Sequence, residues 1–139
     1  MNEIEFPYVK LFKNDKTRPR LPIKVQYRKG SEKVLALIDS GADFTFIPRH
    51  IASKVGLKLK PKNMMEVIGV GGKVDVYKTE TTLVFIINDE EMALPRVTVL
   101  VPEESNFRHT LLGRDTIFRE FRITFDEYNQ LVTFERVYH

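Results

Sequence analysis

Short apolar runs and alternating apolar and polar residues, separated by turn residues, make up most of the chain. This pattern is typical of β-strands, and only two short segments have helical spacing. The sequence therefore predicts an all-β fold. The expected strands are residues 22–28, 32–38, 44–47, 64–68, 73–77, 81–87, 92–101, 109–112, 122–125 and 131–136.

Four groups of turn residues join these strands into hairpins. They are residues 29–31, 69–72, 88–90 and 126–130. The second group contains three glycines, which can adopt positive φ at a tight hairpin tip. We therefore expect a glycine-rich hairpin in the middle of the chain.

Two short helices interrupt the strands. Residues 48–56 begin with proline and end with glycine, which is the arrangement favoured at the two ends of a helix. Residues 116–121 have helical spacing, and Asp115 is the expected N-cap. Both helices are too short to change the all-β fold class.

The 139 residues form one expected domain, residues 1–139. Hydrophobic residues are 42% of the chain, which is enough for a packed core and excludes a disordered chain. We find no internal repeat or linker. Within the domain, we interpret residues 1–20 as a basic N-terminal arm and residues 122–139 as a C-terminal hairpin.

The composition excludes several kinds of chemistry. The chain has no cysteine, so disulfides, thiolate metal ligands and a cysteine nucleophile are absent. The three histidines form no closely spaced pair that would favour a zinc site or a histidine-based triad. We therefore expect no metal and no cofactor.

The start of the chain lacks the basic and then apolar pattern of a secretory signal, because Glu3 and Glu5 lie among its apolar residues. The longest apolar run, residues 83–87, is far too short to cross a bilayer. We expect a cytoplasmic protein that does not enter a membrane.

The net charge of +3 is a weak basic bias, concentrated near the N-terminus. Such a cluster could contact phosphate, but few aromatic residues lie within it, and a solvated arm is the commoner case. Nucleic acid is therefore an unfavoured partner. The clustered residues are Lys10, Lys13, Lys16, Arg18 and Arg20.

The strongest chemical signal is the segment 39–43, Asp-Ser-Gly-Ala-Asp, which directly follows an apolar strand. A carboxylate buried at the end of such a strand is costly unless a partner shares the charge or a proton. An isolated Asp-Ser-Gly is also a common turn after a strand. The glycine-rich hairpin and a later Leu-Leu-Gly-Arg-Asp segment, residues 111–115, strengthen the chemical interpretation.

With these three segments, residues 21–126 resemble the retropepsin-like aspartic proteases. The resemblance implies a single lobe built as a closed β-barrel, with a hairpin flap that closes over the substrate. It implies that Asp39 is catalytic and that Ser40 and Gly41 complete the catalytic loop. The flap corresponds to residues 68–73, and the segment beneath the catalytic loop corresponds to Gly113, Arg114 and Asp115.

The resemblance also assigns roles around the catalytic loop. The Ser40 hydroxyl would bond to the backbone across a dimer axis, and Asp43 would pair with Arg114 and help to hold the peptide. An ordinary surface ion pair is the alternative for Asp43 and Arg114. Apolar cleft walls would come from Leu37, Ile68, Val70 and either Leu111 or Leu112. The expected substrate-binding residues are Ala42, Asp43, Ile68, Gly69, Val70, Gly71, Gly72 and Leu112.

Peptide hydrolysis by carboxyl groups alone needs one carboxylate as base and one carboxylic acid as proton donor. Two carboxyl groups held together share one proton, as in aspartic proteases generally. This chain has one Asp-Ser-Gly segment and no length for a second lobe. The expected enzyme is therefore a homodimeric aspartic endopeptidase, with Asp39 from each copy on the two-fold axis and polypeptide as substrate.

The two ends of the chain depart from the family pattern, because the arm and the C-terminal hairpin are additions. Our hypothesis is that residues 131–137 contribute to a dimer sheet. Two other functions remain open: a catalytically inactive module of the same fold that binds extended peptide or dimerises, and a basic protein that binds nucleic acid with steep salt dependence.

Overall fold

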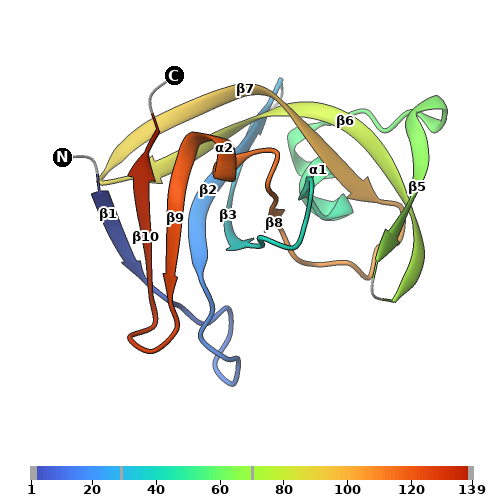
Figure 1. Ribbon diagram of the computed structural model, residues 1–139. Helices are drawn as coiled ribbons and strands as arrows, with labels where there is room; N and C mark the ends of the chain where they lie inside the picture. The colour runs from blue at the N-terminus through green and yellow to red at the C-terminus, as the bar shows by residue number, and fades with distance from the viewer. Residues whose placement is uncertain (1–2, 29, 70, 138–139) are drawn as a thin grey trace.

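Residues 3–28, 30–69 and 71–137 are described by the structure, a computed structural model (Figure 1). Six strands close into a barrel, because β6 pairs with both β7 and β2. In order round the barrel the strands are β2 (Arg20–Tyr27), β3 (Gly30–Ile38), β8 (Leu111–Leu112), β4 (Thr45–Phe46), β7 (Glu90–Pro102) and β6 (Gly72–Ile87). The predicted all-β, retropepsin-like fold class is confirmed.

Alternating side chains fill the barrel. In β2 the residues Leu21, Ile23 and Val25 are fully buried, whereas Pro22 and Lys24 between them are partly exposed. Successive side chains of a strand point to opposite faces, so this two-residue period places one face of β2 in the core. The same alternation that predicted the strand therefore also sets which of its faces is buried.

A second sheet of three strands covers one end of the barrel. It contains β1 (Glu3–Pro7), β10 (Leu131–Arg136) and β9 (Phe121–Asp126), in that order. Phe6 and Phe121 both pack edge-on against Phe134, at ring centroid distances of 5.6 and 5.7 Å. These aromatic contacts join the three strands of the sheet to one another.

The N-terminal segment is therefore not a solvated arm, as its basic residues had indicated. Ile4 and Phe6 alternate with Glu3 and Glu5, and this period-two pattern lets the segment add a strand to β10. The prediction of an arm over residues 1–20 is wrong for β1. The basic residues that follow β1 dominated the sequence pattern and hid the strand.

Arg20 binds the rest of this segment to the barrel. Its guanidinium is 5% exposed and lies 3.0 Å from the Asp15 carboxylate, and it donates to the Val9 carbonyl oxygen at 2.7 Å. Burial disfavours the charged form of Asp15. The backbone N–H groups of Leu11 and Lys16 and the Arg20 guanidinium outweigh that effect, and the pKa of Asp15 is lowered.

Both short helices are present, with one correction. Helix α1 (Arg49–Val55) ends at Gly56, whose φ of +81° is the expected left-handed C-cap. In helix α2 (Ile117–Glu120) the N-cap position is occupied by Thr116 and not by Asp115, and the Thr116 side chain forms no capping hydrogen bond. Asp115 instead forms an ion pair with Arg119 at 3.3 Å. No helix within the described residues is long and apolar enough to cross a membrane.

The middle hairpins also differ in extent from the prediction. Strand β5 (Met64–Gly69) follows a short 3₁₀ turn, Pro61–Asn63, and pairs with the first part of β6. The two strands expected at 73–77 and 81–87 are parts of one strand, β6, which pairs with β7 on both sides of a register shift between Thr81 and Leu83.

The C-terminal hairpin is present, but β10 lies between β1 and β9. Both of its backbone edges are therefore occupied within the described part of the chain. Strand β10 therefore cannot pair with a second copy by its own edge, and the contribution of residues 131–137 to a dimer sheet stays a prediction. The sheet ends at β9 and β1, and only these two strands can extend it.

Candidate active site

Asp39 follows the last residue of β3, where β3 lies parallel to β8. Leu37 pairs with Leu111 and Ile38 with Leu112. The N–H of Asp39 continues this ladder and donates to the Leu112 carbonyl oxygen at 3.0 Å. The barrel thus fixes the backbone of Asp39 at the point where the chain leaves the sheet.

The loop after β3 turns back on the Asp39 side chain. The Gly41 N–H donates to Asp39 Oδ1 at 2.9 Å, and a Cβ atom at Gly41 would lie 3.3 Å from the same oxygen. Asp39 itself is half-buried, while Ser40 and Gly41 are exposed. The loop therefore orients one carboxylate oxygen and leaves this part of the backbone open to an incoming molecule.

A second loop, after β8, holds the first loop from beneath. The Arg114 N–H donates to the Ala42 carbonyl oxygen at 2.8 Å, and the Asp115 N–H donates to the Asp43 carbonyl oxygen at 2.9 Å. The two loops interlock through backbone hydrogen bonds. The structure thus brings together the two segments that the sequence analysis had paired.

Close approach of the two loops requires glycine at position 113. A Cβ atom there would overlap the carbonyl group of Phe44 and lie 2.9 Å from the Ala42 carbonyl oxygen. Backbone atoms cannot move aside as a flexible side chain can. Gly113 therefore supports the site by having no side chain.

Two buried threonines complete this support, and the sequence analysis missed both. The hydroxyls of Thr45 and Thr116 lie 2.6 Å apart, and the Gly113 N–H donates to Thr45 Oγ1 at 3.2 Å. A buried hydroxyl needs such partners. Thr45 lies between Phe44 and Phe46, and alternate residues of a strand point to opposite faces. This alternation was the sequence signal that could have placed Thr45 on the opposite face from the two phenylalanines.

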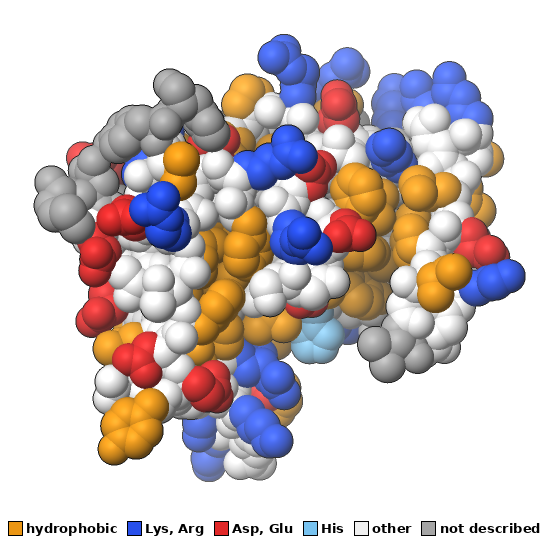
Figure 2. Space-filling model, viewed as in Figure 1, with side chains coloured by type: hydrophobic (Ala, Val, Ile, Leu, Met, Phe, Trp, Pro, Cys, Tyr) orange, Lys and Arg blue, Asp and Glu red, His pale blue; other side chains and the backbone are white. Residues whose placement is uncertain are grey.

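The glycine-rich hairpin lies on the other side of the hollow surface next to these loops. Gly69 of β5 faces Gly72 of β6 across the tip, and Gly72 has a φ of +110° that favours glycine. Ile68 is 84% exposed. Figure 2 shows the surface hollowed between this hairpin and the barrel, with hydrophobic side chains in the hollow. Val70 lies outside the described residues.

Residues 23–116 match the model of the aspartyl protease family. The match covers more than half of the chain and includes both interlocked loops and the hairpin. The chain belongs to the aspartyl protease family. No curated protein sequence matches it.

Two solved structures show the same fold as this family member. One is a retropepsin-like aspartic protease from Rickettsia conorii, at 17% identity and a TM-score of 0.64, with 96% of this chain and 98% of that chain covered. The other is the EIAV protease in complex with the inhibitor HBY-793, at 19% identity and a TM-score of 0.54, with 78% and 93% covered.

One predicted site residue of this family member has a different position. The Leu112 side chain is fully buried and belongs to the core, so it cannot form a cleft wall. Its carbonyl oxygen, however, accepts the N–H of Asp39. Leu112 therefore supports the loop of Asp39 through its backbone, and the half-buried Leu111 and Leu37 are the neighbouring apolar residues that reach the surface.

Within residues 3–28, 30–69 and 71–137, no three histidine, cysteine or acidic residues cluster as they would around a metal ion.

Asp43 and Arg114 form the predicted ion pair, at 3.5 Å between Oδ1 and Nη1. Their side chains are 80% and 64% exposed, so solvent screens the pair. We expect Arg114→Gln to change the free energy of unfolding by less than about 1 kcal/mol, measured by urea denaturation. A loss as large as that of a core substitution would show that Arg114 supports the fold.

Proposed function

We propose that this protein is an aspartic endopeptidase whose active site forms at the axis of a homodimer. The observation that carries the proposal is the position of Asp39, which is half-buried at the end of β3 in a loop that interlocks with the loop after β8, in a chain of the aspartyl protease family. A chain with one such loop supplies one catalytic carboxyl group. A second copy would supply the other.

The proposed chemistry uses only groups of this chain. Two Asp39 carboxyl groups in contact would share one proton, because like charges at this distance cannot both ionise. The ionised one takes a proton from water as the water attacks the peptide carbonyl carbon, and the protonated one donates to the carbonyl oxygen. The tetrahedral intermediate then breaks its C–N bond: the carboxyl group that took the proton from water donates it to the leaving nitrogen, and the other carboxylate takes a proton from a hydroxyl of the intermediate, which restores the single shared proton.

The surroundings of Asp39 supply binding and orientation in this proposal. The Gly41 N–H already orients one carboxylate oxygen, and the exposed Ser40 hydroxyl is free to bond to the second copy. The hairpin of β5 and β6 would close over an extended peptide and exclude water. Its exposed Ile68 favours apolar side chains next to the cleaved bond.

We propose that the dimer contact forms along the open edge of β9 and not along β10. Strand β9 directly follows α2, which follows the supporting loop at Arg114, so its open edge belongs to the same part of the chain as the site. Phe125 of β9 is 38% exposed and lies 6.5 Å from Phe118 between ring centroids. An open edge with exposed aromatic residues is suited to pair with a second copy.

We expect Phe125→Glu to weaken the dimer by at least about tenfold, because it places a charge in an apolar contact. Sedimentation velocity at several protein concentrations measures the change. Tyr128→Glu is the matched control, since Tyr128 is 94% exposed in the hairpin turn and outside β9. Equal effects of the two substitutions would contradict a contact through β9.

The function itself is tested with a mixed peptide library, from which new peptide ends are identified by mass spectrometry. Because a monomer would hold half a site, specific activity should rise with protein concentration in parallel with the dimer fraction. Cleavage that is independent of dimerisation would contradict the shared site. A stable dimer that cleaves no peptide would favour the inactive module.

A further inference from the structure

One groove of the described residues lies away from Asp39, at the point where the strand paired to one edge of β6 changes from β5 to β2. Along one edge, β5 pairs with β6 up to Tyr77, and β2 pairs with it from Thr82 onward. Residues 78–81 pair with β7 on their other edge but with no strand on this one, among the described residues. The barrel wall therefore has a gap of four residues.

In an antiparallel strand, alternate residues direct their N–H and C=O groups to opposite edges. Two of these four residues thus present backbone groups to the gap. Four residues of strand span about 13 Å. At the β2 end of the gap, the Thr81 hydroxyl donates to the Gln26 carbonyl oxygen at 2.7 Å. The rest of the gap is a short strand edge that is open to an added extended segment.

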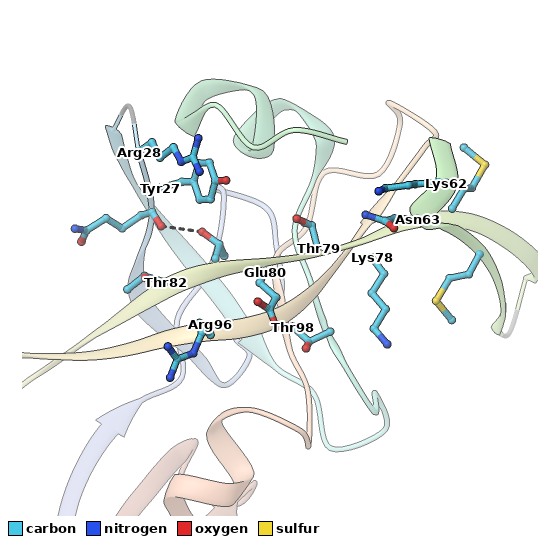
Figure 3. Close-up of a pocket in the computed structure, with 14 residues that line it drawn as sticks. Tyr27, Arg28, Lys62, Asn63, Lys78, Thr79, Glu80, Thr82, Arg96 and Thr98 are labelled. Atoms are coloured by element: carbon cyan, nitrogen blue, oxygen red, sulfur yellow. Dashed lines mark hydrogen bonds between the residues drawn. The ribbon is translucent and has the colours of Figure 1, made fainter. Parts of the chain in front are cut away.

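The groove at this gap has a volume of about 990 Å³. Figure 3 shows the labelled residues coming from four segments: the end of β2, the turn before β5, the centre of β6, and β7. Lys62 and Asn63 lie on one side, Tyr27 and Arg28 on the other, and Thr79 between them.

Positive charge dominates this groove. Four of its lining side chains are basic and one, Glu80, is acidic. None of the four basic side chains forms an ion pair within the described parts of the chain. A negatively charged ligand would therefore find unpaired cations here. They are Arg28, Lys62, Lys78 and Arg96.

The backbone conformation at Arg96 independently supports a binding role for this groove. Pro95 and Arg96 together oppose the single residue Thr82, which makes a β-bulge in β7. Arg96 has a φ of +54°, a left-handed conformation that costs free energy for a residue with a side chain. Bulges change the direction of side chains and are common next to functional sites.

We propose that this groove is a second binding site, for an acidic extended segment of a polypeptide. The basic side chains select acidic residues, and the open edge of residues 78–81 pairs with the peptide backbone. Nucleic acid fits less well, because its backbone cannot continue a β-ladder and the half-buried Tyr27 ring is covered by the Arg28 guanidinium, 5.7 Å from its centroid.

The groove also contacts both arms of the hairpin over the active site. Met64 and Met65 belong to β5, and Lys78 follows the paired part of β6. A bound segment would thus touch the base of the hairpin and the fixed barrel at once. The assignment of this segment to the polypeptide that is cleaved rests on the proposed function. The binding of an acidic segment in the groove does not depend on that function.

The test uses the full chain carrying Asp39→Asn, so that no peptide is cleaved and binding is measured apart from proteolysis. The probe is a fluorescent peptide of alternating glutamate and valine, followed by anisotropy. We expect the Lys62→Gln and Lys78→Gln pair to weaken binding about fivefold at low salt. The Lys13→Gln and Lys16→Gln pair removes the same charge outside the groove and should leave affinity unchanged.

Two further measurements complete the test. Hydrogen exchange at residues 78–81 should slow when the acidic peptide binds, because their open backbone groups become paired. Equal binding of a lysine and valine peptide, equal loss in the control pair, or unchanged exchange would overturn the proposal. Tighter binding of a single-stranded oligonucleotide of the same charge would overturn the assignment to peptide.

Discussion

Asp39→Asn is expected to abolish peptide cleavage while leaving the fold and the dimer intact. An amide can neither take the proton from water nor share a proton with a second carboxyl group, so the acid–base contribution of roughly 10²–10⁴-fold in rate is lost. The Gly41 N–H can still donate to the remaining side-chain oxygen, which preserves the loop. Cleavage rates from the mixed peptide library measure the effect.

Asp89→Asn is the matched control for this experiment. Asp89 lies in the turn between β6 and β7 with a φ of +62°, a conformation that asparagine also tolerates. The same chemical change there should leave cleavage unaffected. Cleavage retained in Asp39→Asn would refute the proposed mechanism. An inactive wild-type protein of native fold would instead favour the peptide-binding module.

Gly113→Ala is expected to destabilise the protein strongly. The added Cβ would overlap the backbone carbonyl of Phe44, and the two interlocked loops would have to separate. Overpacking of a core typically costs about 1–3 kcal/mol, and we expect a loss at the upper end, because backbone atoms are displaced. Thermal unfolding should show Tm lower by about 10 °C.

Gly30→Ala provides the control, since a Cβ at Gly30 meets no atom within 4 Å and the position does not have positive φ. There, alanine should leave Tm unchanged or raise it slightly, by restricting the unfolded chain. A Gly113→Ala protein as stable as Gly30→Ala would mean that the loops tolerate separation, and the interlocked arrangement would not be what holds Asp39.

Much of this fold could be predicted because its strands have local signals. The period-two alternation of β2 and the turn residues at Asn88 and Asp89 identify their elements without knowledge of the partners. Strand pairing is different, because it depends on residues far apart in the chain. The insertion of β1 beside β10 and the exchange of neighbours along β6 are pairings of this kind.

The residues of the candidate site also fall into those with a local sequence signal and those that depend on contacts between distant parts of the chain. Asp39, Gly113 and Arg114 were found through short segments with distinctive residues, and the predicted contact between Asp43 and Arg114 is confirmed. The catalytic role of Asp39 stays a prediction. The pairing of the Thr45 and Thr116 hydroxyls had no local signature, since threonine is common in strands and each hydroxyl has meaning only through the other.

The interlocked loops limit how early the loop of Asp39 can become ordered while the chain is being synthesised. Thr45 and Thr116 are 71 residues apart, as are Asp43 and Arg114. Contacts this remote form late in folding, because the intervening chain must first be ordered. A ribosome would have to release the segment after β8 before the loop of Asp39 could be held in place. The active site proposed for Asp39 would therefore be incomplete in a nascent chain whose segment after β8 has not yet left the ribosome.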